Sequence, residues 1–128
     1  MEKPTQEDLL ATIEKEPLLT DYGMAVWHRT PPADRAAMIE RDRQDLKDRL
    51  RQFRLCCEWL SICNRRKTIN YGIGSSWGLK HRVERYYKEY ITNGAFIAAV
   101  IHMGIPYKKD GSDVYVALSS RHLPGGEE

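Results

Sequence analysis

Several features are scarce in the 128-residue sequence, and each shortage argues against a class of protein. Its longest apolar run, residues 95–101, is far below the roughly 20 residues that a membrane helix needs. Three cysteines are a small and odd number, which argues against a disulfide framework and for a reducing compartment. The first residues include no apolar stretch typical of a secretory signal. We therefore expect a cytoplasmic protein of one structural domain, with no membrane partner.

Residue sets that carry catalysis or hold metals are missing as well. The sequence has no Ser-His-Asp arrangement, carboxylate pair or His-Glu-x-x-His motif. Cys56, Cys57 and Cys63 lack the Cys-x-x-Cys spacing of a structural zinc site. The glycine-rich stretch 72–78 matches neither a P-loop nor a dinucleotide-binding fingerprint. We therefore predict a protein without cofactor or metal and without enzymatic activity.

Acidic residues are nearly absent from one part of a chain whose net charge is only +2. Residues 1–60 carry ten basic and twelve acidic side chains, whereas residues 61–109 carry nine basic side chains against Glu84 and Glu89. Such asymmetry points to a half that binds a polyanion, and the alternative is a solvated basic face. The candidate phosphate contacts are Arg65, Arg66, Lys67, Lys80, Arg82, Arg85, Lys88, Lys108 and Lys109.

The N-terminal 30 residues predict a short helix and a flap. Leu9 and Ile13 follow a start signal at Thr5, and Pro17 stops the helix. Residues 18–30 are expected to be irregular or briefly extended. An apolar flap on the core is expected from Tyr22, Met24, Val26 and Trp27.

A long helix is predicted from the start signal Thr30-Pro31-Pro32 to about residue 64, because no glycine or further proline interrupts it. Some 30 helical residues would span about 45 Å, which exceeds the width of a domain this small. Apolar residues recur along it at heptad spacing, so we favour a homodimer joined through this seam, with internal packing as the alternative. The seam consists of Ile39, Leu46, Leu50, Phe53, Cys57 and Leu60.

Two further helices and a hairpin are predicted after a short strand at 68–71 and a flexible glycine-rich loop. The first, at about 77–90, is basic, and its buried stripe is expected to be Leu79, Val83, Tyr86 and Tyr90. The second, at about 95–103, is apolar all round and is expected to be the buried central element, capped by Thr92 or Asn93.

Asp110-Gly111 lies between alternating apolar residues, which predicts a C-terminal β-hairpin with Lys108 and Lys109 at its tip. The fold class is thus mainly α, with four helices and a small hairpin. Its predicted parts are residues 1–30 (helix and flap), 31–66 (long helix), 67–123 (basic helix-turn-helix and hairpin) and 124–128 (disordered tail).

Helix, tight turn, helix and hairpin is the order of elements in a winged helix-turn-helix. In that motif the second helix reads base edges, but here it offers only His102. Contact with DNA would therefore be made by the basic helix and the hairpin tip, mainly to phosphates. Such binding would discriminate weakly between sequences and depend strongly on salt. We predict a non-enzymatic nucleic-acid-binding accessory or regulatory protein, with DNA favoured over RNA. The alternative is a protein–protein interaction module, such as an inhibitor or adaptor, whose basic half faces an acidic partner.

Tyrosines lie among the cations, and aromatic residues interleaved with basic ones suit single strands by stacking. Tyr86 and Tyr90 belong to the predicted buried stripe, so we expect them in the core. Tyr87 and Tyr107 are expected to be freer, and Tyr115 lies in the hairpin.

Several short motifs of the second half belong together: Ser76-Trp77-Gly78-Leu79-Lys80-His81, then Tyr90-Ile91-Thr92-Asn93-Gly94-Ala95-Phe96-Ile97-Ala98-Ala99, Gly104 and Asp113-Val114-Tyr115-Val116. In these motifs, residues 64–120 resemble small uncharacterised proteins carried by bacterial phages and plasmids. The resemblance implies a mobile-element protein, either a DNA-associated accessory factor or an inhibitor of a host defence complex. It implies no activity or site residues, but it suggests a cap at Asn93 and close helix approach at Gly94.

Overall fold

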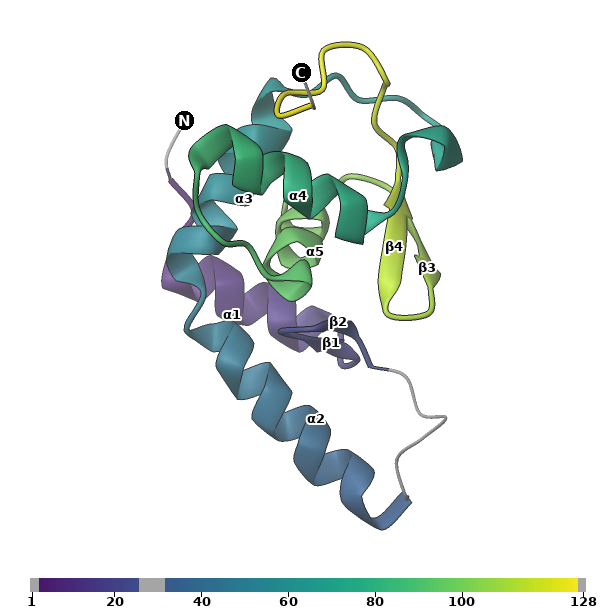
Figure 1. Ribbon diagram of the computed structural model, residues 1–128. Coiled ribbons are helices and arrows are strands. Elements are labelled where there is room, and N and C mark those ends of the chain that lie inside the picture. Colours follow the sequence, from purple (N-terminus) through teal and green to yellow (C-terminus); the bar gives the residue numbers. More distant parts are fainter. Residues whose placement is uncertain (1–2, 26–31, 127–128) are drawn as a thin grey trace.

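The computed structural model describes residues 3–25 and 32–126, which form a mainly helical fold with two small antiparallel hairpins (Figure 1). The predicted fold class is confirmed, but the described residues form five α-helices and not four. In chain order the elements are α1 (Gln6–Lys15), β1 (Leu19–Thr20), β2 (Gly23–Met24), α2 (Pro32–Lys47), α3 (Leu50–Ile62), the 3-10 turn η1 (Tyr71–Ile73), α4 (Ser76–Tyr87), α5 (Asn93–His102), β3 (Tyr107–Asp110) and β4 (Asp113–Val116).

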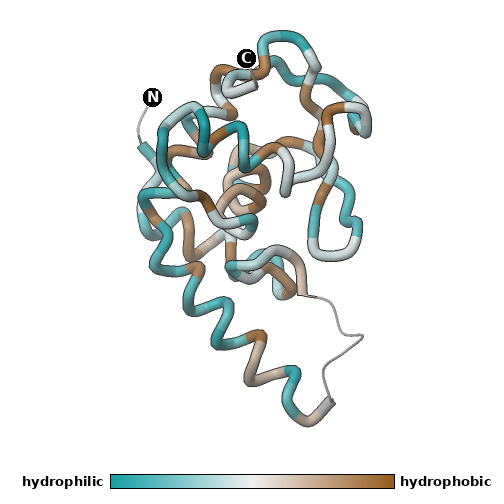
Figure 2. Tube along the Cα trace, viewed as in Figure 1, coloured by the Kyte–Doolittle hydropathy of each residue, from teal (hydrophilic) through white to brown (hydrophobic). Residues whose placement is uncertain are grey.

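The apolar helix α5 forms the centre of the core, as predicted. Every residue from Ala95 to Val100 is fully buried, and α1, α3, α4 and the two hairpins pack around it. Figure 2 shows hydrophobic residues concentrated on α5, whereas α2 is hydrophilic over most of its length. Phe96 meets Trp59 of α3 edge to face, with ring centroids 6.0 Å apart. Among the described residues, no helix has the length and apolarity that crossing a membrane requires.

The predicted long helix is broken, and this corrects the sequence analysis. Helix α2 ends at Lys47 and α3 begins at Leu50, with Arg49 at the N-cap position. The Arg49 guanidinium donates to the buried carboxylate of Asp21, from Nε to both oxygens at 3.2 Å and from Nη2 to Oδ2 at 2.9 Å. The bend lets α3 pack on α5, whereas a straight continuation would follow α2 away from the core (Figure 1). No glycine or proline occurs at the break. A tertiary ion pair and core packing determine its position instead.

The heptad seam is largely an internal packing face. Leu46, Phe53, Cys57 and Leu60 are buried in the core of the single chain, whereas Ile39 and Leu50 are partly exposed. The prediction that these four residues form an exposed dimer seam is therefore wrong. They are already covered by α5 and the elements around it. Homodimerisation itself stays a prediction.

The ends of α1 are held by complementary contacts. At its start, the Thr5 hydroxyl accepts from the Asp8 N–H at 3.2 Å, and the Asp8 carboxylate accepts from the Thr5 N–H at 2.8 Å. At its end, the Arg43 guanidinium donates to the carbonyls of Ile13 and Glu16 at 2.6 and 2.8 Å. Carbonyls of a last helical turn lack partners within the helix, so this arginine joins α2 to α1.

The small β1–β2 hairpin lies against the N-terminus of α5. Met24 is buried and Tyr22 is exposed, while Val26 and Trp27, the other residues of the predicted flap, lie outside the described residues. The Gly94 N–H donates to the Asp21 carbonyl at 3.0 Å. A Cβ on Gly94 would lie 2.0 Å from the Thr20 carbonyl oxygen, so only glycine permits this close approach.

Thr92 caps α5, since its hydroxyl accepts from the Ala95 N–H at 3.1 Å. The cap suggested at Asn93 is therefore corrected. Its side-chain amide donates instead to Asp113 Oδ1 at 2.9 Å and to the Tyr22 carbonyl at 3.2 Å. Asn93 thus ties α5 to both hairpins.

The C-terminal hairpin is confirmed, but its tip differs from the prediction. Lys108 pairs with Tyr115 and Lys109 with Val114 within the strands, so neither lysine lies at the tip. The turn itself packs on β2, where the Met24 N–H donates to the Ser112 carbonyl at 2.8 Å. The strand predicted at 68–71 is also wrong, because Asn70 caps the 3-10 turn η1.

Gly94 and Gly78 form a matched pair for testing the core contact. We expect Gly94→Ala to destabilise the fold by about 3 kcal/mol, because the new methyl group would overlap backbone atoms of β1. Gly78→Ala, within α4, meets nothing within 4 Å and should stabilise by about 0.5–1 kcal/mol. Urea unfolding measures both changes. Equal effects of the two substitutions would contradict the close packing at Gly94.

Candidate nucleic-acid interface

Lys80, one of the nine predicted phosphate contacts, is buried. Only 2% of it is exposed, and its ammonium lies 3.3 Å from Glu84 Oε2. The same ammonium lies 4.5 Å from the ring centroid of Trp77 and 5.2 Å from that of Tyr90. A carboxylate and two aromatic faces replace the water that a buried ammonium loses. The assignment of Lys80 to phosphate contact is therefore wrong: the side chain supports α4 from within.

Glu84 connects this lysine to the rest of the fold. Its carboxylate accepts from the Ile91 N–H at 3.0 Å and lies 2.6 Å from His81 Nδ1. Burial on its own would raise the pKa of Glu84, but hydrogen bonds from Ile91, His81 and Lys80 outweigh it and lower this pKa. Glu84 is therefore held ionised, which keeps charge balanced around Lys80.

Arg82 and Arg85 of α4 contact the C-terminal segment of residues 123–126. Arg82 Nη1 donates to the Leu123 carbonyl at 3.2 Å, and Arg85 Nε donates to the Gly125 carbonyl at 2.7 Å. Trp59 Nε1 donates to the Pro124 carbonyl at 3.2 Å. The tail from Pro124 was predicted to be disordered, and this prediction is wrong for residues 124–126, which make these contacts. These contacts also occupy part of each guanidinium that the sequence assigned to phosphate.

Lys109 and Lys88 are placed differently from one another. Lys109 Nζ pairs with Glu16 Oε1 at 3.0 Å, so its charge is already balanced. Lys88 ends α4 in the left-handed conformation, with φ of 59°, and its side chain is exposed.

Arg65, Arg66 and Lys67 lie beside the end of the C-terminal hairpin. Arg65 forms a β-bridge with Leu118, and the Arg66 N–H donates to the Ala117 carbonyl at 3.0 Å. The Asn70 N–H donates to the Val116 carbonyl at 2.9 Å. Residues 65–70 thus run along β4 and its continuation, and all three cations are exposed.

Tyr71, Tyr115 and Lys108 form an aromatic–cationic cluster at the same edge. The two rings lie 5.0 Å apart at 57°, and Lys108 Nζ lies 6.0 Å from the Tyr71 ring. Tyr71 is 54% exposed, so much of its surface is open to a ligand. We call residues 65–71, Lys108 and Tyr115 the cationic edge. No acidic residue occurs between positions 64 and 75, so this segment itself contributes no anion that would compete with a phosphate.

The predicted burial of four tyrosines is reversed in the structure: those expected in the core are exposed, and those expected to be freer are partly buried. Tyr86 and Tyr90, expected in the core, are 49% and 69% exposed. Tyr87 is partly buried, and burial raises its pKa. Tyr107 is partly buried too and donates to Glu16 Oε2 at 3.2 Å. The helix ends at Tyr87, earlier than expected, so the buried stripe does not continue to Tyr90. Tyr71 was missed, although its place shortly after three cations was a usable signal.

The three thiols are buried and unpaired. Burial raises the pKa of Cys57 and of Cys63 to about 12. It raises the pKa of Cys56 well above its usual range. These thiols therefore stay protonated near neutral pH, which makes them poor nucleophiles and poor metal ligands. Among the described residues, no group of three His, Cys, Asp or Glu side chains is placed to hold a metal ion.

Comparison with protein-family models, with curated proteins and with solved structures found no match to this chain. The resemblance to phage- and plasmid-borne proteins stays a prediction.

Glu84→Gln tests the buried charge pair. We expect it to destabilise the fold by about 2 kcal/mol near neutral pH, because Lys80 loses its anionic partner. The pKa of Glu84 is lowered in the fold, so its stabilisation is present above the unfolded pKa and lost as the pH falls through the folded one. In urea unfolding, the difference from wild type should therefore shrink as the pH falls below the unfolded pKa of Glu84. A difference that stays constant with pH would assign Glu84 a packing role only. Glu40→Gln, on exposed α2, is the matched control.

Gly125→Val tests the docking of the tail. Gly125 has φ of +78°, and a Cβ there would lie 2.0 Å from the Arg82 carbonyl oxygen. We expect the variant to release residues 123–126 and to change the indole N–H resonance of Trp59 in NMR spectra. Gly126→Ala is the control, because its Cβ would meet only the movable end of the Arg82 side chain, at 3.0 Å. An unchanged Trp59 signal in Gly125→Val would show that the tail contacts are weak.

Proposed function

We propose that this protein binds single-stranded nucleic acid along the cationic edge, as a non-enzymatic accessory or regulatory protein. The carrying observation is the exposed ring of Tyr71, which packs on the partly exposed ring of Tyr115, lies beside Lys108 and follows the exposed cations of residues 65–67 in the chain. Base–aromatic stacking combined with backbone neutralisation is the usual way in which single strands are bound without sequence preference. This assignment moves the proposed site from the basic helix α4 to a strand edge.

Several observations favour a single strand over a duplex. Helix α5, which would be the recognition helix of a helix-turn-helix, is buried in the core. The hairpin turn is packed on β2 and cannot enter a groove as a wing. Lys80 is internal, and Arg82 and Arg85 contact the tail. Apart from Lys88, the open cations that remain belong to residues 65–67 or lie beside the exposed ring of Tyr71, and rings stack on unpaired bases.

The geometry also defines how a strand would be held. Arg65 and Lys67 are exposed, and neither side chain has an acceptor among the described residues. They are free to neutralise phosphates, and each neutralised phosphate releases counterions and steepens the salt dependence. Lys108 lies near the face of Tyr71, where it also adds positive charge close to a stacked base. DNA remains the first nucleic acid to test.

A protein partner is the second candidate function. Trp77 and Tyr90 are 54% and 69% exposed, and both rings contact the ammonium of Lys80. Exposed Trp and Tyr side chains held in place by packing are typical of binding hot spots. This surface would suit a protein that has a complementary apolar pocket. It predicts that Trp77→Ala abolishes partner binding without affecting nucleic acid.

Fluorescence anisotropy with labelled single-stranded and duplex DNA and RNA, at about 50 and 200 mM salt, tests the proposal. We expect tighter binding of the single strands, with a strong loss at the higher salt. Tyr71→Ala should weaken binding about tenfold, the amount expected for one lost stacking contact. Lys67→Glu combined with Lys108→Glu should nearly abolish it.

The matched control is Lys15→Glu combined with Arg41→Glu, which makes the same charge change on exposed positions of α1 and α2. It should leave most of the affinity intact. Equal losses in both double variants would show that only net charge matters. The absence of binding at the lower salt would contradict the proposal.

A further inference from the structure

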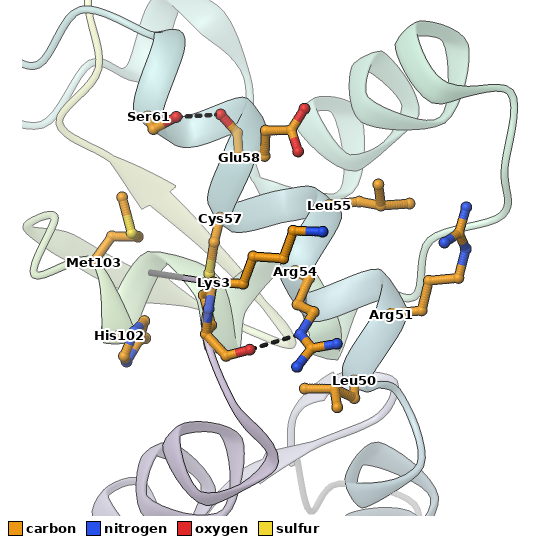
Figure 3. Close-up of a pocket in the computed structure, with 11 residues that line it drawn as sticks. Lys3, Leu50, Arg51, Arg54, Leu55, Cys57, Glu58, Ser61, His102 and Met103 are labelled. Atoms are coloured by element: carbon orange, nitrogen blue, oxygen red, sulfur yellow. Dashed lines mark hydrogen bonds between the residues drawn. The ribbon is translucent and has the colours of Figure 1, made fainter. Parts of the chain in front are cut away.

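A groove of about 720 Å³ lies on the side of α3, between that helix, residues 3–4 and the end of α5 (Figure 3). Its residues are not part of the cationic edge. A volume of this size falls within the range of about 300–1,000 Å³ that small-molecule sites occupy. We therefore considered what ligand its walls would accept.

The walls of the groove are largely apolar. Leu50, Leu55, Cys57 and Met103 contribute aliphatic and sulfur-containing surface. The thiol of Cys57 is protonated, because burial raises its pKa to about 12, so it adds no charge. The ring of His102, which also lines the groove, packs near Phe53 with centroids 5.4 Å apart. Such walls suit an apolar ligand body.

Two cations stand over this apolar surface, and neither is paired with an acid among the described residues. Both Lys3 and Arg54 line the groove, and Lys3 directly precedes Pro4, whose carbonyl oxygen Arg54 contacts (Figure 3). Arg54 Nε donates to the Pro4 carbonyl at 2.6 Å, which fixes the guanidinium, and its two terminal nitrogens have no acceptor among the described residues. Arg51 also lines the groove, but Glu89 balances its charge. The acid on the lining is Glu58, so positive charge is in excess.

We propose that this groove binds a small anionic amphiphile, a carboxylate with an apolar chain. The carboxylate would lie between Lys3 and Arg54, since guanidinium and ammonium groups form strong charge-assisted hydrogen bonds with it. The chain would cover Leu50, Leu55 and Met103. The arrangement combines a mostly apolar cavity with few convergent polar groups, which is the usual composition of a ligand site.

The test uses the full chain and the probe 11-(dansylamino)undecanoate, followed by fluorescence titration and by displacement. We expect saturable binding to one site, displacement by decanoate, and no displacement by decyltrimethylammonium. In NMR spectra, decanoate should shift signals of α3 and of residues 102–103. Lys3→Glu should weaken probe binding about tenfold, because it replaces an attractive contact by repulsion. The control Lys15→Glu changes the charge equally on an exposed position of α1 outside the groove and should bind normally.

Other outcomes would overturn the proposal. Equal displacement by the cationic and anionic amphiphiles would remove the role of Lys3 and Arg54. No saturable binding below about 1 mM would remove the site. Preference for an acidic leucine-rich peptide over decanoate would assign the groove to a protein partner. Concentration-dependent dimerisation that blocks the probe would assign the groove to a second copy of this chain.

Leu55→Asp tests the apolar contact. The variant, whose fold is checked by circular dichroism, should abolish probe binding, and normal binding by a folded variant would contradict the apolar contact.

Discussion

Burial of α5 on every side is the constraint on which the rest of the structure depends. A helix without an apolar-polar division needs neighbours around its whole circumference. In this chain α1, α3, α4 and both hairpins supply them, and Gly94 lets a strand backbone touch its first turn. The break between α2 and α3 follows from the same requirement, since α3 must turn to pack on α5. Arg49 and Asp21 hold that bend at the surface of the core.

The same constraint determines which charges face outward. Lys80 lies on the inner side of α4, and its ammonium is balanced by Glu84 and by two aromatic rings. The tail covers another part of α4 and takes contacts from Arg82 and Arg85. The cations of residues 65–67 are left at the edge of the hairpin, in the same segment as the exposed ring of Tyr71. Local basic composition therefore did not indicate which cations face the solvent.

Local signals predicted much of the fold. The capping pattern at Thr5, the uncharged run of α5 and the Asp-Gly turn each determine structure through neighbours in sequence, and each was found where expected. The break at Arg49 was not predictable in this way, because its partner Asp21 lies 28 positions away and no glycine or proline marks it. Burial of Lys80 was missed for a similar reason: Trp77 is its neighbour within α4, but Tyr90 approaches it only after α4 has ended and the chain has turned back. The aromatic cluster at Tyr71 depends on pairing between residues 65–70 and β4, which no local pattern announces.

The central claim is that a single strand lies along the cationic edge. NMR titration of the isotope-labelled protein with an oligothymidylate of about eight nucleotides tests it most directly. The account predicts that backbone signals of residues 65–71, 108 and 115 shift together and saturate, while those of α2 and the hairpin turn stay unchanged. Shifts confined to the outer face of α4, or no shifts at all, would contradict it.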